Sequence, residues 1–328
     1  MFNDKFNKPY VDFLNINYPQ EDHLILCRRV HHFDFPKGSN VVEVKDYSKV
    51  NMENFNGKLI CHSLFDKKVV DLLNNNKNLL EKAYWVVWGG DLYGAPDDEK
   101  NNFIRRNLKG YLTVAPNDQK IIANKYGNYK AKYFNIQYII PTSFEQLHTA
   151  KQNKVFSDKT RILINNSCSE STIEMLDILA KFAHENIEVS TILSYGDLKF
   201  KEAIISQGRA IYRDKFSYLD EMLSPGEYAN YLNNISIFIF NQNRQQGLGN
   251  IFAALYLGAK IYIKNNISSS EMLKNLEFKI YDTYDIENIN FYTLIKNNNT
   301  EFNSKKALLF FDVNHIKSLW GNVFKDET

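Results

Sequence analysis

Residues 235–257 read ISIFIFNQNRQQGLGNIFAALYL, and this stretch gives the first indication of the fold class. Residues 235–240 are apolar and rich in β-branched and aromatic side chains, as in a buried strand. A turn rich in glutamine and glycine follows, and residues 250–257 then have the composition of a buried helix. A strand that leads through a short turn into a helix is typical of a βαβ unit. The stretch therefore predicts a parallel sheet with helices on its faces.

The same alternation continues on both sides of this stretch. Strands are predicted at residues 161–167, 187–193, 209–212, 260–264 and 278–281, and helices at 173–184, 198–207, 216–223, 227–233 and 269–275. Ser171 and Glu174 have the spacing of a capping box at the start of the first of these helices. Sheets of this kind bind ligands at the carboxyl ends of their strands, beside the point where the strand order reverses.

The first half of the chain shows a looser version of the same pattern. Strands are predicted at residues 24–27, 41–44, 59–63, 84–88 and 111–114, with helices at 6–14, 67–73, 96–108 and 117–126. A chain of 328 residues exceeds what one hydrophobic core usually serves. We therefore predict an α/β protein of two Rossmann-like domains that face a cleft. Their predicted bounds are 1–150 and 151–304, and a C-terminal helix in 305–328 is expected to pack back on the N-terminal domain.

The composition excludes several classes of function. The net charge is +2, so we expect no positive electrostatic potential strong enough to attract nucleic acid. Pairs of basic residues such as Arg105-Arg106 are interpreted as solvated surface residues. Three cysteines without a CxxC pattern indicate neither a disulfide framework nor a zinc site. There is no signal peptide and no apolar run of about 20 residues. We expect a reduced, cytoplasmic protein without a bound metal or other cofactor, in contact with membranes at most peripherally.

The turn RQQGLGN at 244–250 is the first candidate site. Glycines before a helix expose backbone N–H groups, and the helix dipole favours an anion there. Arg244 could add a bidentate phosphate contact. The spacing matches neither the GxGxxG fingerprint nor the P-loop, and a plain strand–helix turn is the alternative. The predicted donor-binding residues of this turn are Arg244, Gln246, Gly247, Leu248, Gly249 and Asn250.

Two further strand-end loops are expected beside this turn. Asn166 and Ser167 follow the predicted strand 161–167, and Tyr195 and Asp197 follow the strand 187–193. In a doubly wound sheet these loops converge on one edge, which strengthens the case for a shared donor site. The alternatives are simple turn formation for Asn166 and Ser167, and N-capping of the next helix for Asp197.

The first half offers the motif WGGDLY at residues 88–93. We interpret Asp91 as a catalytic base or a sugar-hydroxyl acceptor, with the ring of Trp88 or Tyr93 stacked on a sugar. Gly90 permits close approach of the backbone to a ligand, and His62 is kept as a candidate on the acceptor side. The alternatives are a glycine turn with Asp91 as a helix N-cap, and a histidine that is only part of the core.

Taken together, these motifs resemble the Fuc4NAc (4-acetamido-4,6-dideoxy-D-galactose) transferase family of enterobacterial common antigen synthesis, glycosyltransferase family 56. The residues that carry the resemblance are WGGDLY at 88–93, LSYGD at 193–197, Phe240-Asn241 with RQQGLGN at 244–250, LYLGAKIY at 255–262, and Asn17, Glu21 and His23. The chain departs from the family pattern after Asn166 and Ser167, where a histidine is missing.

The resemblance implies a metal-independent glycosyltransferase with the GT-B fold. It implies a dTDP-sugar donor bound by the second domain, and an undecaprenyl-diphosphate-linked saccharide acceptor bound by the first. It also implies work at the inner face of the bacterial cell membrane, as a peripheral protein. The alternatives that remain open are another nucleotide sugar, a nucleotide-sugar epimerase or dehydrogenase, and a non-catalytic nucleotide-sugar-binding protein.

Overall fold

The computed structural model describes residues 1, 4–29, 33–155 and 157–326. The chain divides into two compact units: Met1–Pro141 with Asp312–Thr328, and Thr142–Phe311. The division thus falls earlier than the predicted boundary at residue 150, which lies inside helix α6 (Phe144–Gln152). This helix belongs to the second unit because Leu147 and Ala150 are buried there, and because Asn233 donates a hydrogen bond to the carbonyl of Ala150 at 2.6 Å.

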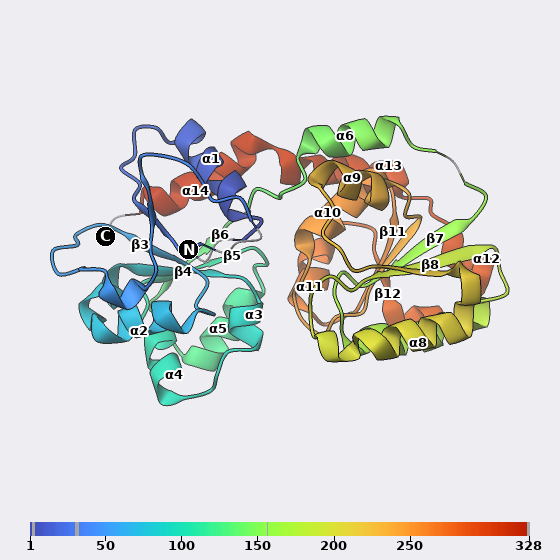
Figure 1. Cartoon of the computed structure of the whole chain (residues 1–328), viewed down its shortest axis with the longest axis horizontal. Helices are drawn as coiled ribbons and strands as arrows, with labels where there is room; N and C mark the ends of the chain where they lie inside the picture. The colour runs from blue at the N-terminus through green and yellow to red at the C-terminus, as the bar shows by residue number, and fades with distance from the viewer. Residues whose placement is uncertain (2–3, 30–32, 156, 327–328) are drawn as a thin grey trace. The chain divides into compact units, whose positions relative to one another are not determined.

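The second unit is built on a six-stranded parallel sheet (Figure 1). Its strands are β7 (Thr160–Ile164), β8 (Ile187–Ile192), β9 (Phe216–Leu219), β10 (Ile237–Phe240), β11 (Lys260–Ile263) and β12 (Tyr281–Asp282). They lie in the order β12-β11-β10-β7-β8-β9: β8 and β9 follow on one side of β7, and β10, β11 and β12 then follow on its other side. The strand order therefore reverses between β7 and β10, which is where a sheet of this type leaves a crevice for a ligand.

Helices cover both faces of this sheet (Figure 1). They are α6, α7 (Glu170–Leu179), α8 (Lys201–Tyr212), α9 (Pro225–Asn233), α10 (Leu248–Leu257), α11 (Ser268–Asn275), α12 (Phe291–Ile295) and α13 (Thr300–Ala307). Ile162 and Ile164 of β7 share one core cluster with residues of α7 and α8. Leu163 between them is also buried and points to the opposite face, because side chains alternate along a strand.

Two predicted elements of the second unit are wrong. Residues 209–212, predicted as a strand, form the end of α8, and residues 216–219, predicted as helical, form β9. Tyr212 is buried and donates a hydrogen bond to the carbonyl of Leu176 in α7, which keeps this turn in the helix. Gly208 lies so close to the ring of Phe216 that a Cβ would come within 2.4 Å of it. Packing of α8 on β9 therefore overrides the local pattern.

The first unit contains a four-stranded parallel sheet in the order β3-β4-β5-β6 and a separate parallel pair, β1-β2. The strands are β1 (Ile25–Cys27), β2 (Val41–Glu43), β3 (Leu59–His62), β4 (Ala83–Val87), β5 (Gly110–Thr113) and β6 (Lys132–Asn135). The helices are α1 (Asn7–Asn17), α2 (Lys67–Asn75), α3 (Gly90–Tyr93), α4 (Glu99–Arg106), α5 (Asp118–Tyr126) and α14 (Val313–Phe324). Every residue of β4 is buried.

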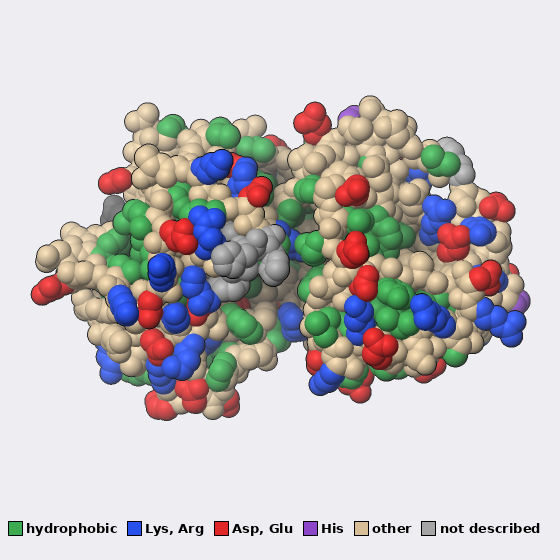
Figure 2. All heavy atoms as spheres, viewed as in Figure 1, with side chains coloured by type: hydrophobic (Ala, Val, Ile, Leu, Met, Phe, Trp, Pro, Cys, Tyr) green, Lys and Arg blue, Asp and Glu red, His purple; other side chains and the backbone are tan. Residues whose placement is uncertain are grey.

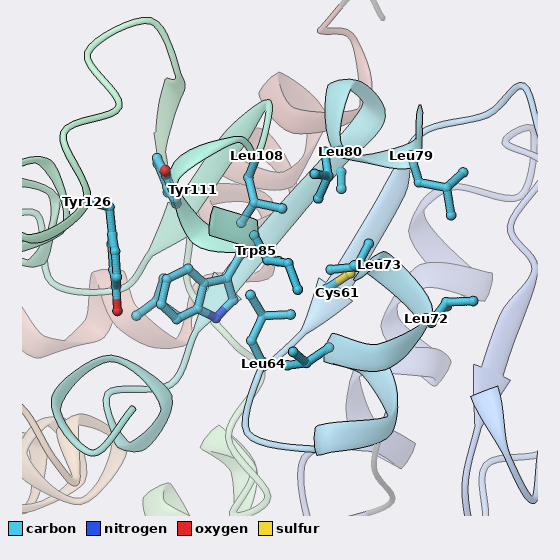
Figure 3. Close-up of a cluster of buried hydrophobic side chains, with 14 of the residues drawn as sticks. Cys61, Leu64, Leu72, Leu73, Leu79, Leu80, Trp85, Leu108, Tyr111 and Tyr126 are labelled. Atoms are coloured by element: carbon cyan, nitrogen blue, oxygen red, sulfur yellow. The ribbon is translucent and has the colours of Figure 1, made fainter. Parts of the chain in front are cut away.

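Alternate residues of β4 enter two different cores. Trp85 lies in a cluster with Leu64, Leu108, Tyr111 and Tyr126 on one face of the sheet (Figure 3). Tyr84 and Val86 point to the other face, where α1 and α14 cover them. This period of two is what a strand buried on both sides requires.

The predicted C-terminal helix is two helices. Residues 305–307 end α13 in the second unit, whereas α14 packs in the first unit. The break occurs at Asp312, whose side chain accepts a hydrogen bond from the backbone of Asn314 and caps α14. Trp320 is 0% exposed and donates from its Nε1 to the carbonyl of Gln137 at 2.9 Å. Across the described ranges, none of the helices is both long enough and apolar enough to span a bilayer.

Candidate functional site

The start of helix α10 is the centre of the candidate site in the second unit. Gly247 precedes the helix with φ of 66°, a left-handed conformation that favours glycine. A Cβ on this residue would lie 2.3 Å from Nδ2 of Asn166. Within the residues that the structure describes, the N–H groups of Leu248 and Gly249 have no acceptor. Since the first N–H groups of a helix also carry its positive dipole end, the place favours an anion.

The loop after β7 supplies a hydroxyl donor next to these amides. Oγ of Ser167 accepts hydrogen bonds from Nε2 of Gln246 at 2.6 Å and from Nε2 of Gln242 at 3.2 Å. Because a hydroxyl that accepts two such bonds still carries its own proton, Ser167 can donate that proton to a ligand. The side chain is 2% exposed, so its orientation is fixed by these two partners rather than by water.

Asn166 joins this loop to the loop after β8. Its Nδ2 donates to the hydroxyl of Tyr195 at 2.8 Å, while its Oδ1 is buried without a partner. Burial raises the pKa of the Tyr195 phenol to about 12, against the opposing effects of the nearby Arg244 charge and of hydrogen bonds from Asn166 and Gln246. The phenol therefore stays protonated at neutral pH.

A close backbone contact also ties the loops after β7 and β8 together. The N–H of Cys168 donates to the carbonyl of Tyr195 at 2.8 Å, and the N–H of Asp197 donates to the carbonyl of Cys168 at 3.0 Å. Gly196 lies between them with φ of 105°, and a Cβ there would come within 2.5 Å of the Cys168 carbonyl oxygen. The two loops thus form one rigid edge beside Gly247.

Arg244 and Asp197 lie in this loop region with different surroundings. Arg244 is partly buried, and its Nη1 donates to the carbonyl of Gln245 at 3.2 Å. Asp197 is exposed; its carboxylate accepts from the backbone of Lys199 at 3.4 Å and pairs with the Lys199 ammonium at 2.9 Å. The geometry therefore favours N-capping for Asp197 over the predicted contact with a donor.

Two asparagines that sequence reasoning missed hold the carboxyl ends of β7 and β10 together. Oδ1 of Asn165 accepts from the N–H of Asn241 at 2.7 Å, and its Nδ2 donates to Oγ1 of Thr172 at 2.9 Å. Nδ2 of Asn241 in turn donates to Glu174 at 2.9 Å. The predicted capping box of Ser171 and Glu174 is wrong, because α7 begins after Ser169 and both residues lie inside the helix. Asn165 and Asn241 each directly follow a buried strand, and this position in the sequence could have indicated their role.

Asp91 in the first unit does not have the geometry of a catalytic base. It is 1% exposed. Its Oδ2 accepts from the N–H of Leu64 at 2.9 Å and from Nε1 of Trp85 at 2.6 Å, and its Oδ1 accepts from the N–H of Trp88 at 2.9 Å. Both oxygens thus bind internal donors, whereas a base must reach the hydroxyl whose proton it takes. These hydrogen bonds favour a structural role for Asp91, which fixes the loops that follow β3 and β4, over the predicted role as a base.

His62 and Trp88 belong to an aromatic cluster below these loops. Nδ1 of His62 contacts the hydroxyl of Tyr138. The imidazole ring of His62 is stacked on the ring of Trp320, with an angle of 16° between the two ring planes. Burial holds the pKa of His62 well below its ordinary value, so the ring is neutral. The Trp88 ring packs on Tyr138 at 4.5 Å between centroids and on Phe6 at 5.0 Å. Packing within this aromatic cluster accounts for the positions of His62 and Trp88, without any contact to an acceptor sugar.

Gly90 and Tyr93 occupy the short helix α3. Gly89, with φ of 81°, makes the turn into it, and a Cβ on Gly90 would meet nothing within 4 Å. The hydroxyl of Tyr93 donates to Asp118 at 2.6 Å, which ties α3 to α5. The surface at Gly90 is therefore open to a close approach of a ligand to the backbone.

Comparison with known proteins identifies the family. The family described as 4-alpha-L-fucosyltransferase, glycosyl transferase group 56, matches residues 40–326. This chain belongs to glycosyl transferase group 56. The match spans both compact units, so the protein is a glycosyltransferase, and the expected resemblance is confirmed.

The group 56 chain is also similar to solved structures along its whole length. WaaG, a glycosyltransferase involved in lipopolysaccharide biosynthesis, is 9% identical with a TM-score of 0.62, over 99% of this chain and 96% of that one. A glycosyltransferase from Rickettsia africae ESF-5 is 11% identical with a TM-score of 0.61, over 99% and 96%. S. aureus MnaA, solved with UDP, is 11% identical with a TM-score of 0.60, over 100% and 97%. At such low identity these likenesses show the fold alone, and they confirm the predicted GT-B architecture.

Over the described residues, no group of three or more His, Cys, Asp or Glu side chains is arranged to hold a metal ion. The polar groups that gather at the start of α10 are instead amides, hydroxyls and one guanidinium. Such donors suit an anionic ligand.

Proposed function

We propose that this protein transfers a 4-acetamido-4,6-dideoxyhexose from a dTDP-sugar to a lipid-linked saccharide at the inner face of the bacterial cell membrane. One observation supports the donor half above all: Gly247 starts α10 against Asn166, where only a glycine fits, and leaves two amides free beside the Ser167 hydroxyl. Membership of group 56 supports sugar transfer. The motifs shared with the Fuc4NAc transferases support the choice of sugar and of nucleotide.

The diphosphate of the donor is assigned to the start of α10. The N–H groups of Leu248 and Gly249 and the hydroxyl of Ser167 donate to its oxygens, and the guanidinium of Arg244 adds a full positive charge. Negative charge grows on the diphosphate as the sugar–phosphate bond breaks. Donors that are already fixed in place stabilise this charge more than they stabilise the ground state, which lowers the barrier.

Gln246, Tyr195 and Asn166 keep that site in shape. Gln246 orients the Ser167 hydroxyl, and Asn166 holds the Tyr195 phenol. Asn250, in the first turn of the helix, is a further candidate for a sugar contact.

The acceptor half is assigned to the first unit. An undecaprenyl-diphosphate-linked saccharide stays anchored in the bilayer, so the enzyme meets it as a peripheral protein. Asp91 contributes as a positioning residue, because it fixes the loops after β3 and β4. The open surface at Gly90 lets the acceptor sugar contact the backbone.

Calorimetry with nucleoside diphosphates tests the donor half. We expect dTDP to bind more tightly than UDP, GDP or ADP, and Ser167→Ala to weaken dTDP binding at least about tenfold, as the loss of a hydrogen bond to a charged group does. Ser206→Ala, on the exposed surface of α8, is the matched control. Equal affinity of wild type and Ser167→Ala for dTDP would remove Ser167 from the site.

A transfer assay tests the reaction itself. Radiolabelled sugar should move from dTDP-4-acetamido-4,6-dideoxygalactose to a prenyl-diphosphate saccharide, and addition of EDTA should leave the rate unchanged if amides and Arg244 suffice for the diphosphate. Binding of dTDP without any transfer would favour the non-catalytic alternative. Transfer of a different sugar would correct the donor and leave the diphosphate site intact.

A further inference from the structure

The loop after β3 displays an aromatic side chain to solvent. Phe65 is 76% exposed and lies between the end of β3 at His62 and the start of α2 at Lys67. Isolated apolar side chains on a surface are common and need no explanation by themselves. The backbone that carries Phe65 is unusual, however, because four separate interactions hold it.

Two buried residues clamp Leu64, which directly precedes the exposed ring. The Leu64 N–H donates to Asp91 at 2.9 Å, and the Leu64 carbonyl accepts from Nη2 of Arg105 at 3.1 Å. The two ends of the short loop are fixed as well: the N–H of Ser63 donates to the carbonyl of Val86, and the N–H of Phe65 donates to Oγ of Ser63 at 3.0 Å.

Arg105 was expected at the surface, yet its side chain is buried. It is 1% exposed, its guanidinium lies over the ring of Trp85 at 5.1 Å, and burial lowers its pKa. Taking a guanidinium out of water is costly. Here the guanidinium donates to the carbonyl of Leu64, in the loop after β3, and to that of Asp91, in the short helix α3 that follows β4.

The backbone of the loop is also strained. Ser63 has φ of 79°, a conformation that L-residues other than glycine rarely adopt. Strained residues persist where the surrounding structure determines them, and they are common at sites of recognition. A buried charge and a strained residue thus keep the Phe65 backbone in one position while its ring is left exposed.

We propose that the Phe65 ring stacks on a sugar ring of the saccharide acceptor and helps to select it; this inference rests on the proposed transfer to a saccharide. The face of an aromatic ring is electron-rich, and the C–H groups on one face of a pyranose carry partial positive charge, so the two surfaces are complementary. Since the loop is already ordered, binding loses little conformational entropy.

The charges around Phe65 favour a sugar over a lipid surface as the partner. Arg28 pairs with Asp66 at 2.9 Å, Lys67 with Asp71 at 3.2 Å, and Lys68 with Asp46 at 3.9 Å. On the visible face of the first unit, Lys and Arg side chains are interspersed with Asp and Glu (Figure 2). Binding to anionic lipid relies on clusters of basic residues that lack such partners.

Equilibrium binding of short-chain, water-soluble prenyl-diphosphate mono- and disaccharides, measured by calorimetry without any donor, tests the assignment. For the saccharide that wild type binds best, we expect Phe65→Ala and Phe65→Leu to weaken binding about tenfold, because both remove the flat ring. Phe65→Trp should stay within about threefold of wild type. Tyr129→Ala, which removes another exposed aromatic ring of the first unit, is the matched control.

A second variant separates the ring from its support. Ser63→Gly relieves the positive φ and removes the hydrogen bond to Phe65, so we expect an unchanged or higher melting temperature together with weaker saccharide binding. Wild-type affinity of Phe65→Leu or Phe65→Ala, or no saccharide binding by wild type, overturns the proposal. Weaker binding of Phe65→Ala to anionic vesicles with unchanged saccharide affinity would assign the ring to the membrane instead. A wild type that binds saccharide but transfers no sugar would contradict the proposed function and leave the role of Phe65 standing.

Discussion

Gly247 combines a positive φ with a neighbour in the place where a Cβ would stand. Gly247→Ala must therefore move either the start of α10 or Asn166, and both changes disturb the proposed diphosphate site. We expect the affinity for dTDP to fall at least about tenfold, since strain of this kind amounts to about 1–3 kcal/mol. Isothermal titration calorimetry measures it. Gly226→Ala is the matched control, because a Cβ there meets nothing within 4 Å; equal affinities for the two variants would contradict the assignment.

Asp91 accepts three internal hydrogen bonds with its two carboxylate oxygens. Asp91→Asn replaces one oxygen by an NH2 group, so at least one buried donor loses its acceptor. We expect the free energy of unfolding to fall by about 1–3 kcal/mol, and turnover to fall because the loops after β3 and β4 shift. Chemical denaturation and the transfer assay check this together. A variant that is as stable as wild type yet inactive would restore Asp91 as a catalytic base.

The sequence was enough to find these positions but not to assign their roles. Gly247 and Asp91 both follow buried strands, and that placement is readable from local apolar runs. The difference between a base and a positioning residue depends on which donors reach the carboxylate. Leu64 is 27 residues away from Asp91, and no local pattern indicates that its N–H points there. The same holds for Arg105, whose burial depends on the loop that it supports.

Helix α14 shows how one element contributes to the first unit across a long sequence separation. Trp320 is fully buried and bonds to Gln137. Trp320→Ala should lower the free energy of unfolding of the first unit by about 3–5 kcal/mol, and Trp320→Phe by less, because the ring is partly replaced. Denaturation with guanidinium gives these values. The affinity for dTDP, assigned to the second unit, should not change under conditions where the variant is folded; a loss of that affinity would show that the two units are not independent in this respect.

Element prediction worked best where strands are fully buried. β10 and β11 lie within the predicted ranges, and β7 begins one residue before its predicted range, because a continuous apolar run between turn residues leaves few other structures. β6 was not predicted: it lies at the edge of its sheet, and its residues are only partly buried or exposed, so the run KYFN carries no apolar pattern. The prediction reversed strand and helix at residues 209–219, because the structure of such short segments depends on the elements they pack against.

The stability of the whole chain should depend on pH below neutrality. Burial depresses the pKa of His62 in the fold, and that of His23 by less. In the unfolded chain each titrates near its ordinary pKa of about 6.5. The unfolded state therefore binds more protons as the pH falls below that value, and stability decreases toward the folded-state pKa, by up to about 1.4 kcal/mol per pH unit for each proton.

Melting temperatures between pH 7.5 and 5 check this dependence. His62→Gln should flatten the profile. His184→Gln, at a side chain that is 75% exposed, serves as the control and should follow wild type. A profile of His62→Gln that is as steep as that of wild type would show that other groups, such as carboxylates, account for the loss of stability in acid.

The path of the chain through the two units has a consequence for biosynthesis. The second unit is inserted into the first, since residues 142–311 lie between the segments that make up unit 1. A ribosome releases all of the inserted unit before it releases α14. The first unit therefore lacks the part of its core that α14 supplies, beside Tyr84 and Val86, while the second unit can already fold. A released chain truncated after residue 311 should bind nucleotide while its opening segment is still cut by protease.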